Sequence, residues 1–223
     1  MSGELPTLES LREYPKSRFY LEQADKFLEK IGYTEHGFRH ADIVAKHSRE
    51  ILSKLSYPER TAELAAIAGF FHDIGNLLGR FNHGIAGAFI SKDILTDKGF
   101  SLEETARVMC AIGNHEDEGG DIPDEITAAL IIADKTDVHR SRVRNENFIS
   151  FDIHDRVNFA ATESILDIDP KSRIITLNLT IDTRISQVME YFEIFLTRMI
   201  LCRKASQYLK CNFSLLMNGV KVL

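Results

Sequence analysis

Six histidine and aspartate residues between positions 40 and 134 could together bind metal ions. Imidazole and carboxylate groups are ligands that intermediate and hard divalent cations accept. His72 and Asp73 are adjacent, and the carboxylate of Asp73 can bridge two ions, which a neutral imidazole cannot do. Six ligands suffice for two ions that share one carboxylate, so the set predicts a hydrolytic metal centre. The six residues are His40, His72, Asp73, His83, His115 and Asp134.

The length and charge of the chain limit its class. The 223 residues fit one domain with room for a small appendage, and they can bury a sizeable core. The chain has 33 acidic and 27 basic residues, a formal net charge of -6. This balance argues against binding to extended nucleic acid or to anionic membranes, although it is compatible with a local basic pocket.

The cysteines and the N-terminal residues indicate a cytoplasmic protein. Cys110, Cys202 and Cys211 are scattered and include no CxxC pair, so neither a disulfide framework nor a zinc ribbon is predicted. The residues through Leu8 contain no basic segment followed by an apolar run, so we expect no secretory signal. No apolar stretch approaches the length needed to span a bilayer.

The candidate ligands lie at or near the ends of predicted helices. Ser56-Tyr57-Pro58-Glu59 has the pattern of a capping box that opens an apolar helix, and Gly75 ends it, so His72 and Asp73 fall on its last turn. Ser101-Leu102-Glu103-Glu104 is a second capping box. Bundles build metal sites from side chains on facing helices, and we expect at least four helices to contribute. The predicted helices cover residues 16–31, 38–55, 59–75, 84–95 and 102–115, and a further helix starts at 124.

The pattern changes in the last third of the chain. Apolar and polar residues alternate over residues 175–181, which is typical of a strand. Asp169-Pro170-Lys171-Ser172 indicates a turn, so residues 157–168 are the predicted partner strand. Asn218-Gly219 is typical of a β-hairpin, and apolar residues at helical spacing predict a long helix over residues 186–209.

The expected fold is therefore mainly α, with two regions. Residues 1–156 form a helical metal-binding domain, and residues 157–223 form a small α+β extension packed on it. The extension combines an antiparallel sheet with the long helix. It could complete the core, cover a substrate as a lid, or form a homodimer interface. The last role requires that one face of the long helix stays unburied in the monomer.

The candidate ligands occur in five short segments: His36-Gly37-Phe38-Arg39-His40-Ala41-Asp42, Phe71-His72-Asp73-Ile74-Gly75, His83-Gly84-Ile85-Ala86-Gly87, Asn114-His115-Glu116 and Ile132-Ala133-Asp134-Lys135. Together these segments resemble the HD superfamily of metal-dependent phosphohydrolases, in its binuclear branch with six ligands. That branch includes bacterial dinucleoside tetraphosphate hydrolases and cyclic-dinucleotide phosphodiesterases. The resemblance covers roughly residues 36 to 140 and implies a helical bundle of the HD type.

The resemblance also implies how the six ligands divide between two divalent ions. The first ion would be held by His40, His72, Asp73 and Asp134. The second ion would be held by His83 and His115, with Asp73 as the bridge. The ligand types favour Fe or Mn, with Zn, Co, Ni and Mg as alternatives. A hydroxide activated between the ions would attack phosphorus, so Asp73 is also a candidate catalytic residue.

Basic residues follow Asp134 directly in the sequence. Lys135, Arg140, Arg142 and Arg144 form a run that a solvated helix end would also explain. Because the run begins beside a candidate ligand, Lys135 and Arg140 are predicted to contact a phosphate group of the substrate.

Four other residues have two interpretations each. His36 is expected to orient His40 or to cap its helix rather than to bind metal, because six ligands already exist. Asp137 lies one turn after Asp134 and could support a ligand or pair with a cation. Glu116 and Glu118 could donate a proton to the leaving group or belong to an exposed acidic loop.

Three functions from different classes fit these residues. The first is a metal-dependent phosphohydrolase that cleaves a phosphate ester or anhydride of a small nucleotide-like substrate. The second is a di-iron oxygenase, because the same mixture of histidine and carboxylate ligands suits iron chemistry with dioxygen. The third is a nucleotide sensor or interaction module without turnover. The six complete ligand positions and the basic run favour the phosphohydrolase.

Overall fold

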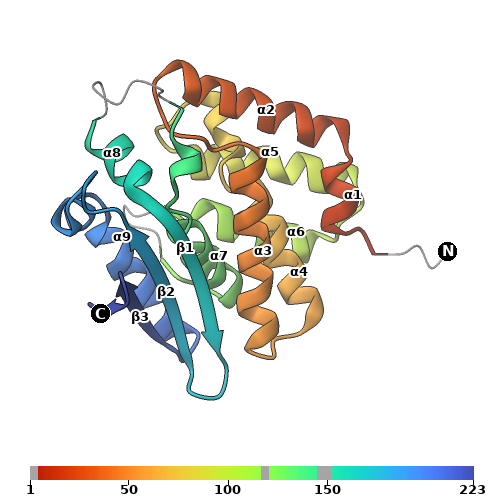
Figure 1. The fold of residues 1–223 in the computed structure, drawn as a ribbon. Helices are drawn as coiled ribbons and strands as arrows, with labels where there is room; N and C mark the ends of the chain where they lie inside the picture. The colour runs from red at the N-terminus through yellow and green to blue at the C-terminus, as the bar shows by residue number, and fades with distance from the viewer. Residues whose placement is uncertain (1–4, 117–120, 145–151) are drawn as a thin grey trace.

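The protein is described by a computed structural model that covers residues 5–116, 121–144 and 152–223 (Figure 1). Its first part is helical, as predicted from the apolar spacing. The helices are α1 (Leu8–Arg12), α2 (Pro15–Lys30), α3 (Phe38–Lys54), α4 (Glu59–Phe71), the 3₁₀-helix η1 (Ile74–Leu78), α5 (His83–Asp97), α6 (Leu102–Gly113) and α7 (Glu125–Lys135).

Helices α4 and α7 form the centre of the helical region. Every residue from Leu64 to Phe71 in α4 and from Ile126 to Ala133 in α7 is buried. A helix that is apolar on all sides must be surrounded by protein. The amphipathic α3 packs against both. Its N-terminus lies beside the C-termini of α4 and α7, because His40 near the start of α3 meets His72 after α4 and Asp134 near the end of α7.

The two predicted helix starts have different outcomes. The capping box at Ser101 is confirmed, since its hydroxyl accepts the N–H of Glu104 at 3.2 Å. The box at Ser56 is wrong, because Ser56 has a φ of 64° and α4 begins after Pro58 without a side-chain cap. Helix α4 also ends earlier than Gly75. His72 is its C-cap, and the chain tightens into η1 directly after Asp73.

Gly75 lies where η1 packs against the first turns of α5. A β-carbon at this position would overlap the backbone oxygen of His83 and the backbone nitrogen of Gly87. Because both are main-chain atoms of one helix, they can move away only if α5 moves. Gly75→Ala is therefore expected to destabilise the protein by more than about 2 kcal/mol, measured by urea unfolding.

Gly113→Ala is the matched control for this substitution. Apart from its chain neighbours and the nearby backbone of its own helix, its added β-carbon would meet no atom of the described residues within 4 Å. Gly113 is the last residue of α6. Alanine has less conformational entropy than glycine in the unfolded chain, so the variant should keep or slightly gain stability. Equal unfolding free energies for the two alanine variants would contradict the proposed packing of η1 on α5.

The C-terminal part combines helices with a four-stranded sheet of order β1-β2-β3-β4. In Figure 1 the strands and α9 lie on one side of the molecule, away from α1. The elements are the 3₁₀-helix η2 (Arg140–Arg142), α8 (Ile153–Ala160), β1 (Ala161–Asp169), β2 (Ile174–Ile181), α9 (Val188–Tyr208), β3 (Asn212–Met217) and β4 (Val220–Lys221).

The sheet is mixed, which corrects the antiparallel prediction. Strands β1 and β2 are antiparallel, but β2 and β3 are parallel, with Ile175 opposite Phe213. The reason is that α9 connects β2 to β3 as a crossover, which returns the chain in the same direction.

The predicted hairpin at Asn218 is confirmed between β3 and β4. Residues 157–160, predicted as strand, belong instead to α8, which Asp152 caps.

The C-terminal elements share the core of the helical region. Helix α9 packs on α7 and buries Tyr191, Phe195 and Met199. The predicted boundary between residues 156 and 157 falls within α8, and the division of the chain into two domains stays a prediction. Within residues 5–116, 121–144 and 152–223, no helix combines the length and apolarity required to cross a bilayer.

Candidate metal centre

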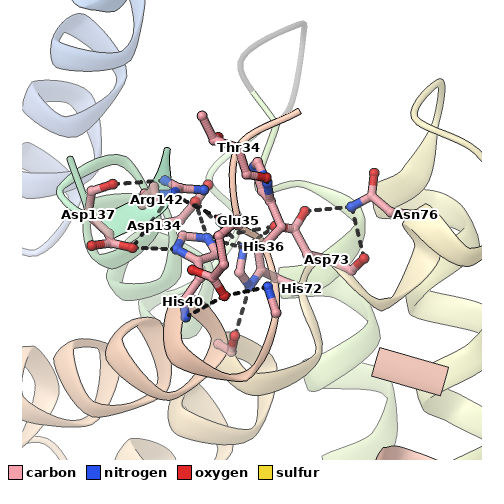
Figure 2. Close-up of polar contacts among 12 residues, drawn as sticks. Thr34, Glu35, His36, His40, His72, Asp73, Asn76, Asp134, Asp137 and Arg142 are labelled. Atoms are coloured by element: carbon pink, nitrogen blue, oxygen red, sulfur yellow. Dashed lines mark hydrogen bonds and ion pairs between the residues drawn. The ribbon is translucent and has the colours of Figure 1, made fainter. Parts of the chain in front are cut away.

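The structure brings the six predicted ligands to one place, where the ends of several helices meet. They come from the first turn of α3, the junction of α4 with η1, the first residue of α5, the segment after α6 and the last turn of α7. Figure 2 shows four of them close together: His40, His72, Asp73 and Asp134. All six are buried except Asp134, whose side chain is 13% exposed.

One group of ligand atoms surrounds the Nε2 atoms of His40 and His72. These two nitrogens are 3.2 Å apart, and the Nε2 of His40 is 3.3 Å from Oδ1 of Asp134. One ligand atom from each of these three residues lies within 4.8 Å of the others. Two imidazole nitrogens and a carboxylate oxygen that face the same point are suited to a cation between them.

Asp73 connects this group to a second one, in which ligand atoms of His72, Asp73 and His115 lie within 4.8 Å of one another. Its Oδ2 atom is 3.1 Å from Nε2 of His72, and its Oδ1 atom is 3.1 Å from Nε2 of His83. His115 completes the second side, with its ring 5.1 Å from the rings of both His72 and His83. The two oxygens of Asp73 thus face different histidines, as a bridging carboxylate requires.

The Nδ1 atom of each of the four histidines has an acceptor within hydrogen-bonding distance. His72 and His115 donate to backbone carbonyls, so their Nδ1 atoms carry hydrogen and their Nε2 atoms face the centre. Partners of this kind fix the tautomer and orientation of metal-binding histidines. The pairs are His40 with Asp137 at 2.7 Å, His72 with the carbonyl of Gly69 at 2.8 Å, His83 with Glu116 at 2.6 Å and His115 with the carbonyl of Ile112 at 2.6 Å.

The comparison with protein families agrees with this geometry. Residues 36–139 match the sequence model of the HD domain family. The chain contains an HD domain. The match confirms the predicted resemblance to the HD superfamily, whose domains are typical of metal-dependent hydrolases and bind divalent cations, while the assignment to its binuclear branch stays a prediction. Helices α8 and α9 and the sheet lie outside the matched residues.

One curated relative is similar to about half of the chain. An uncharacterized protein of Methanocaldococcus jannaschii is 30% identical over 138 residues. The match covers 52% of this chain and 52% of the relative, so the chain spans about half the length of that protein.

The charges within the HD domain favour cation binding. Burial raises the pKa of Asp134, but the Lys135 ammonium at 2.7 Å and contacts with two histidines outweigh it and hold that pKa well below its usual range. Burial lowers the pKa of His72, but Asp73 and Asp134 outweigh it and raise that pKa to about 10. A cation at Nε2 of His72 must replace a proton there, so metal affinity is expected to fall as the pH decreases.

Asn76 fixes the orientation of Asp73. Its side-chain amide donates to Oδ1 of Asp73 and to the backbone oxygen of the same residue, both at 2.9 Å. Asn76 is fully buried, and Figure 2 shows both bonds. Sequence reasoning did not identify this role. The spacing of three residues, which places Asn76 one turn of η1 after Asp73, is the signal that could have found it.

Asp137 fulfils both of its predicted roles. Its Oδ2 atom accepts the Nδ1 hydrogen of His40 at 2.7 Å and also binds the guanidinium of Arg39 at 2.9 Å. His36 contacts His40 as predicted, since their rings meet edge to face with centroids 5.5 Å apart, but its Nδ1 bonds the carbonyl of Thr34 and it does not cap α3. The N–H of Gly37, the N-cap of α3, is bound by the carboxylate of Glu35.

Asp137→Asn is expected to weaken the binding of the first metal by about 10- to 100-fold. The amide keeps an acceptor for His40 but loses the negative charge that makes its imidazole a stronger ligand. Competition with a coloured chelator measures the affinity. Arg39→Ala is the control, since it removes the ion pair and leaves the contact between Asp137 and His40. An equal loss in both variants would show that the ion pair, not the orientation of His40, matters.

A cavity of about 530 Å³ lies against the ligands, and we call it the metal cavity. Its lining includes ligands of both groups and four cationic side chains. Of the two cations predicted to contact phosphate, Lys135 lines it, but Arg140 is not among the described residues that do; its guanidinium lies 5.3 Å from the ring centroid of Phe159. The four cations are Arg80, Lys135, Arg142 and Arg198.

The acidic residues after His115 are placed only in part. Glu116 lines the metal cavity, and its carboxylate is 2.6 Å from Nδ1 of His83, so it orients this histidine. Glu118, the other predicted proton donor, lies outside the described residues.

Proposed function

We propose that the protein is a phosphohydrolase with two divalent ions that cleaves a phosphate ester or anhydride of a small nucleotide-like substrate. One observation supports this most strongly: four histidines have their Nδ1 atoms held by the protein and surround a carboxylate whose two oxygens face different histidines. The mixture of imidazole and carboxylate favours Fe or Mn, and Zn, Co, Ni or Mg could also occupy such a site.

Each part of the site has a role in this proposal. Two bound ions would supply a deprotonated water as nucleophile and neutralise charge on the phosphoryl oxygens. Asp73 bridges the two ligand groups and sets their separation. Lys135, which bonds Asp134 at 2.7 Å, and Arg80, which is 3.6 Å from Oδ1 of Asp73, place positive charge where a phosphate would enter.

The lining of the metal cavity favours phosphate over dioxygen. Three arginines and one lysine face a single cavity in a chain whose net charge is -6. Dioxygen is uncharged, so four nearby cations would not attract it. A phosphate group carries about two negative charges near neutral pH and would be attracted by them. Arg80 and Arg142 come from different elements, so the positive charge is built by the fold and not by one basic segment.

Metal analysis combined with a substrate panel tests this function. The purified protein should contain close to two ions for each chain. Loaded with Mn²⁺ or Fe²⁺, it should release phosphate or a shorter nucleotide from members of a nucleotide panel, and chelation should abolish the release. Dioxygen uptake by the iron form without any cleavage would instead support the oxygenase. Nucleotide binding without either reaction would support a sensor.

A further inference from the structure

A second cavity adjoins the metal cavity. It has a volume of about 490 Å³ and shares four lining residues with the metal cavity, so one wall is common to both. These shared residues are His36, Arg80, Arg142 and Arg198. We call the second cavity the outer chamber. Its further lining includes Ile31, Tyr33, Asp152, Asp155, Asn158 and Phe195.

The outer chamber is built jointly by the HD domain and by elements outside it. Tyr33 comes from the connection between α2 and α3, Asp155 and Asn158 from α8, and Phe195 from α9. All four lie beyond residues 36–139, which match the HD family. The C-terminal elements therefore do more than complete the core, because they form a wall beside the metal cavity.

The chemistry of the outer chamber changes from one side to the other. The shared wall is cationic, and the guanidinium of Arg80 lies 5.8 Å from the ring centroid of Tyr33. The ring of Tyr33 is partly open to solvent, with 43% of the residue exposed. The α8 side supplies the carboxylates of Asp152 and Asp155, which accept hydrogen bonds. A ligand that suits all three parts has an anionic end, a flat face and hydroxyl or amino donors.

We propose that the outer chamber binds the nucleoside part of a nucleotide whose phosphate occupies the metal cavity. This inference rests on the proposed function of the metal centre. The base would stack on Tyr33, the hydroxyl or amino groups would donate to Asp155, and the phosphate would pass the arginines of the shared wall. On hydrolysis, water adds to phosphorus, the bond between phosphorus and the nucleoside oxygen breaks, and that oxygen takes a proton.

The size of the cavities supports a nucleotide over a smaller ester. Binding sites for small molecules usually measure about 300–1,000 Å³. The metal cavity alone, at about 530 Å³, would hold a simple phosphate ester without the outer chamber. A nucleotide is long enough to occupy both and to use the aromatic ring and the carboxylates that a simple ester would leave without contact.

Calorimetric binding to the Mn²⁺-loaded protein tests the proposal without turnover. The probes are methylphosphonate and the methylene phosphonate analogues of adenosine, guanosine, cytidine and uridine monophosphates, which are not hydrolysed. At least one nucleoside analogue should bind about tenfold or more tightly than methylphosphonate. Tyr33→Ala should reduce this preference by about tenfold, as expected for a lost base stack.

Tyr208→Ala is the matched control. Tyr208 is also 43% exposed, but it lies at the end of α9 and bonds the carbonyl of Pro123, and it is not among the described residues that line either cavity. This variant should keep the preference of the native protein. Asp155→Asn provides a second measurement and should also reduce the preference for the nucleoside analogue.

Two outcomes would overturn the proposal. One is that no nucleoside analogue binds more tightly than methylphosphonate. The other is that Tyr33→Ala and Asp155→Asn both keep the native ratio of the two affinities, or weaken both probes equally. Failure of the proposed function is recognised separately, because a nucleotide can be bound with this preference and never cleaved. Conversely, phosphate release with unchanged ratios would leave the function intact and disprove the outer chamber alone.

Discussion

Asp73→Ala is expected to remove both metal ions and to lower phosphate release by at least about a thousandfold. The two oxygens of Asp73 are each 3.1 Å from a histidine Nε2 atom, one in His72 and the other in His83. Loss of the carboxylate therefore removes a ligand from both groups and removes the negative charge that would offset the repulsion between two adjacent cations. Elemental analysis after gel filtration measures the ions, and a phosphate assay measures the activity.

Two comparison variants make this result specific. His83→Ala removes a ligand from the second group only, so its metal content should fall to about one ion. Asp167→Ala changes an exposed aspartate on β1 and should keep two ions and full activity. Circular dichroism verifies that Asp73→Ala is folded. If folded Asp73→Ala retains a tightly bound ion, or if the native protein binds only one, Asp73 is not a bridge between two metals.

The residues of the metal centre lie at or near helix ends, and local sequence patterns mark some of these ends. The apolar run before His72 locates the end of α4 from a local pattern, whereas the capping box at Ser101 locates only the start of α6, at the opposite end from His115. The clustering itself followed from the resemblance to a known family and not from the apolar spacing. Asp73 has a recognisable setting in the sequence, since it comes just after the apolar residues 64–71, all of which are buried.

Contacts between distant segments could not be predicted in this way. His40 and Asp137 are separated by 97 positions, and their hydrogen bond depends on how α3 crosses α7. The position of Arg142 instead of Arg140 at the metal cavity depends on η2, a short 3₁₀-helix that apolar spacing does not reveal. The alternation of apolar and polar residues in β2 shows that one face of the strand is buried. It does not indicate whether the neighbouring β3 runs parallel or antiparallel to β2.

The lining of the outer chamber could not be predicted from the sequence either, because it combines residues from distant segments. Arg80 precedes α5 and Arg198 lies on α9, yet both line the wall between the two cavities. Arg80 is three residues before His83, but no local pattern marks Arg198, so only the tertiary packing of α9 places it beside Arg80. Function assigned from the HD motif alone would omit every residue of the C-terminal part that faces the substrate site.

Arg80→Ala is expected to lower kcat/KM for phosphate esters by about 100- to 1,000-fold while the protein retains two metal ions. The Nη1 atom of Arg80 is 3.6 Å from Oδ1 of Asp73, and its side chain is 34% exposed, so the guanidinium borders both the ligands and the metal cavity. From this position it can bind two phosphate oxygens at once and stabilise charge that develops on them. Steady-state kinetics together with elemental analysis measures both effects.

The alternative is that Arg80 only supports the metal ligands, since it also lies 3.2 Å from Nε2 of His83. Arg80→Lys separates the two roles: it keeps a positive charge but not the paired donors, and it should recover part of kcat/KM. Arg203→Ala, an exposed arginine on α9, controls for the general loss of positive charge and should retain full activity. A drop to one ion in Arg80→Ala, with normal turnover once excess metal is supplied, would assign Arg80 to the metal site and not to the phosphate.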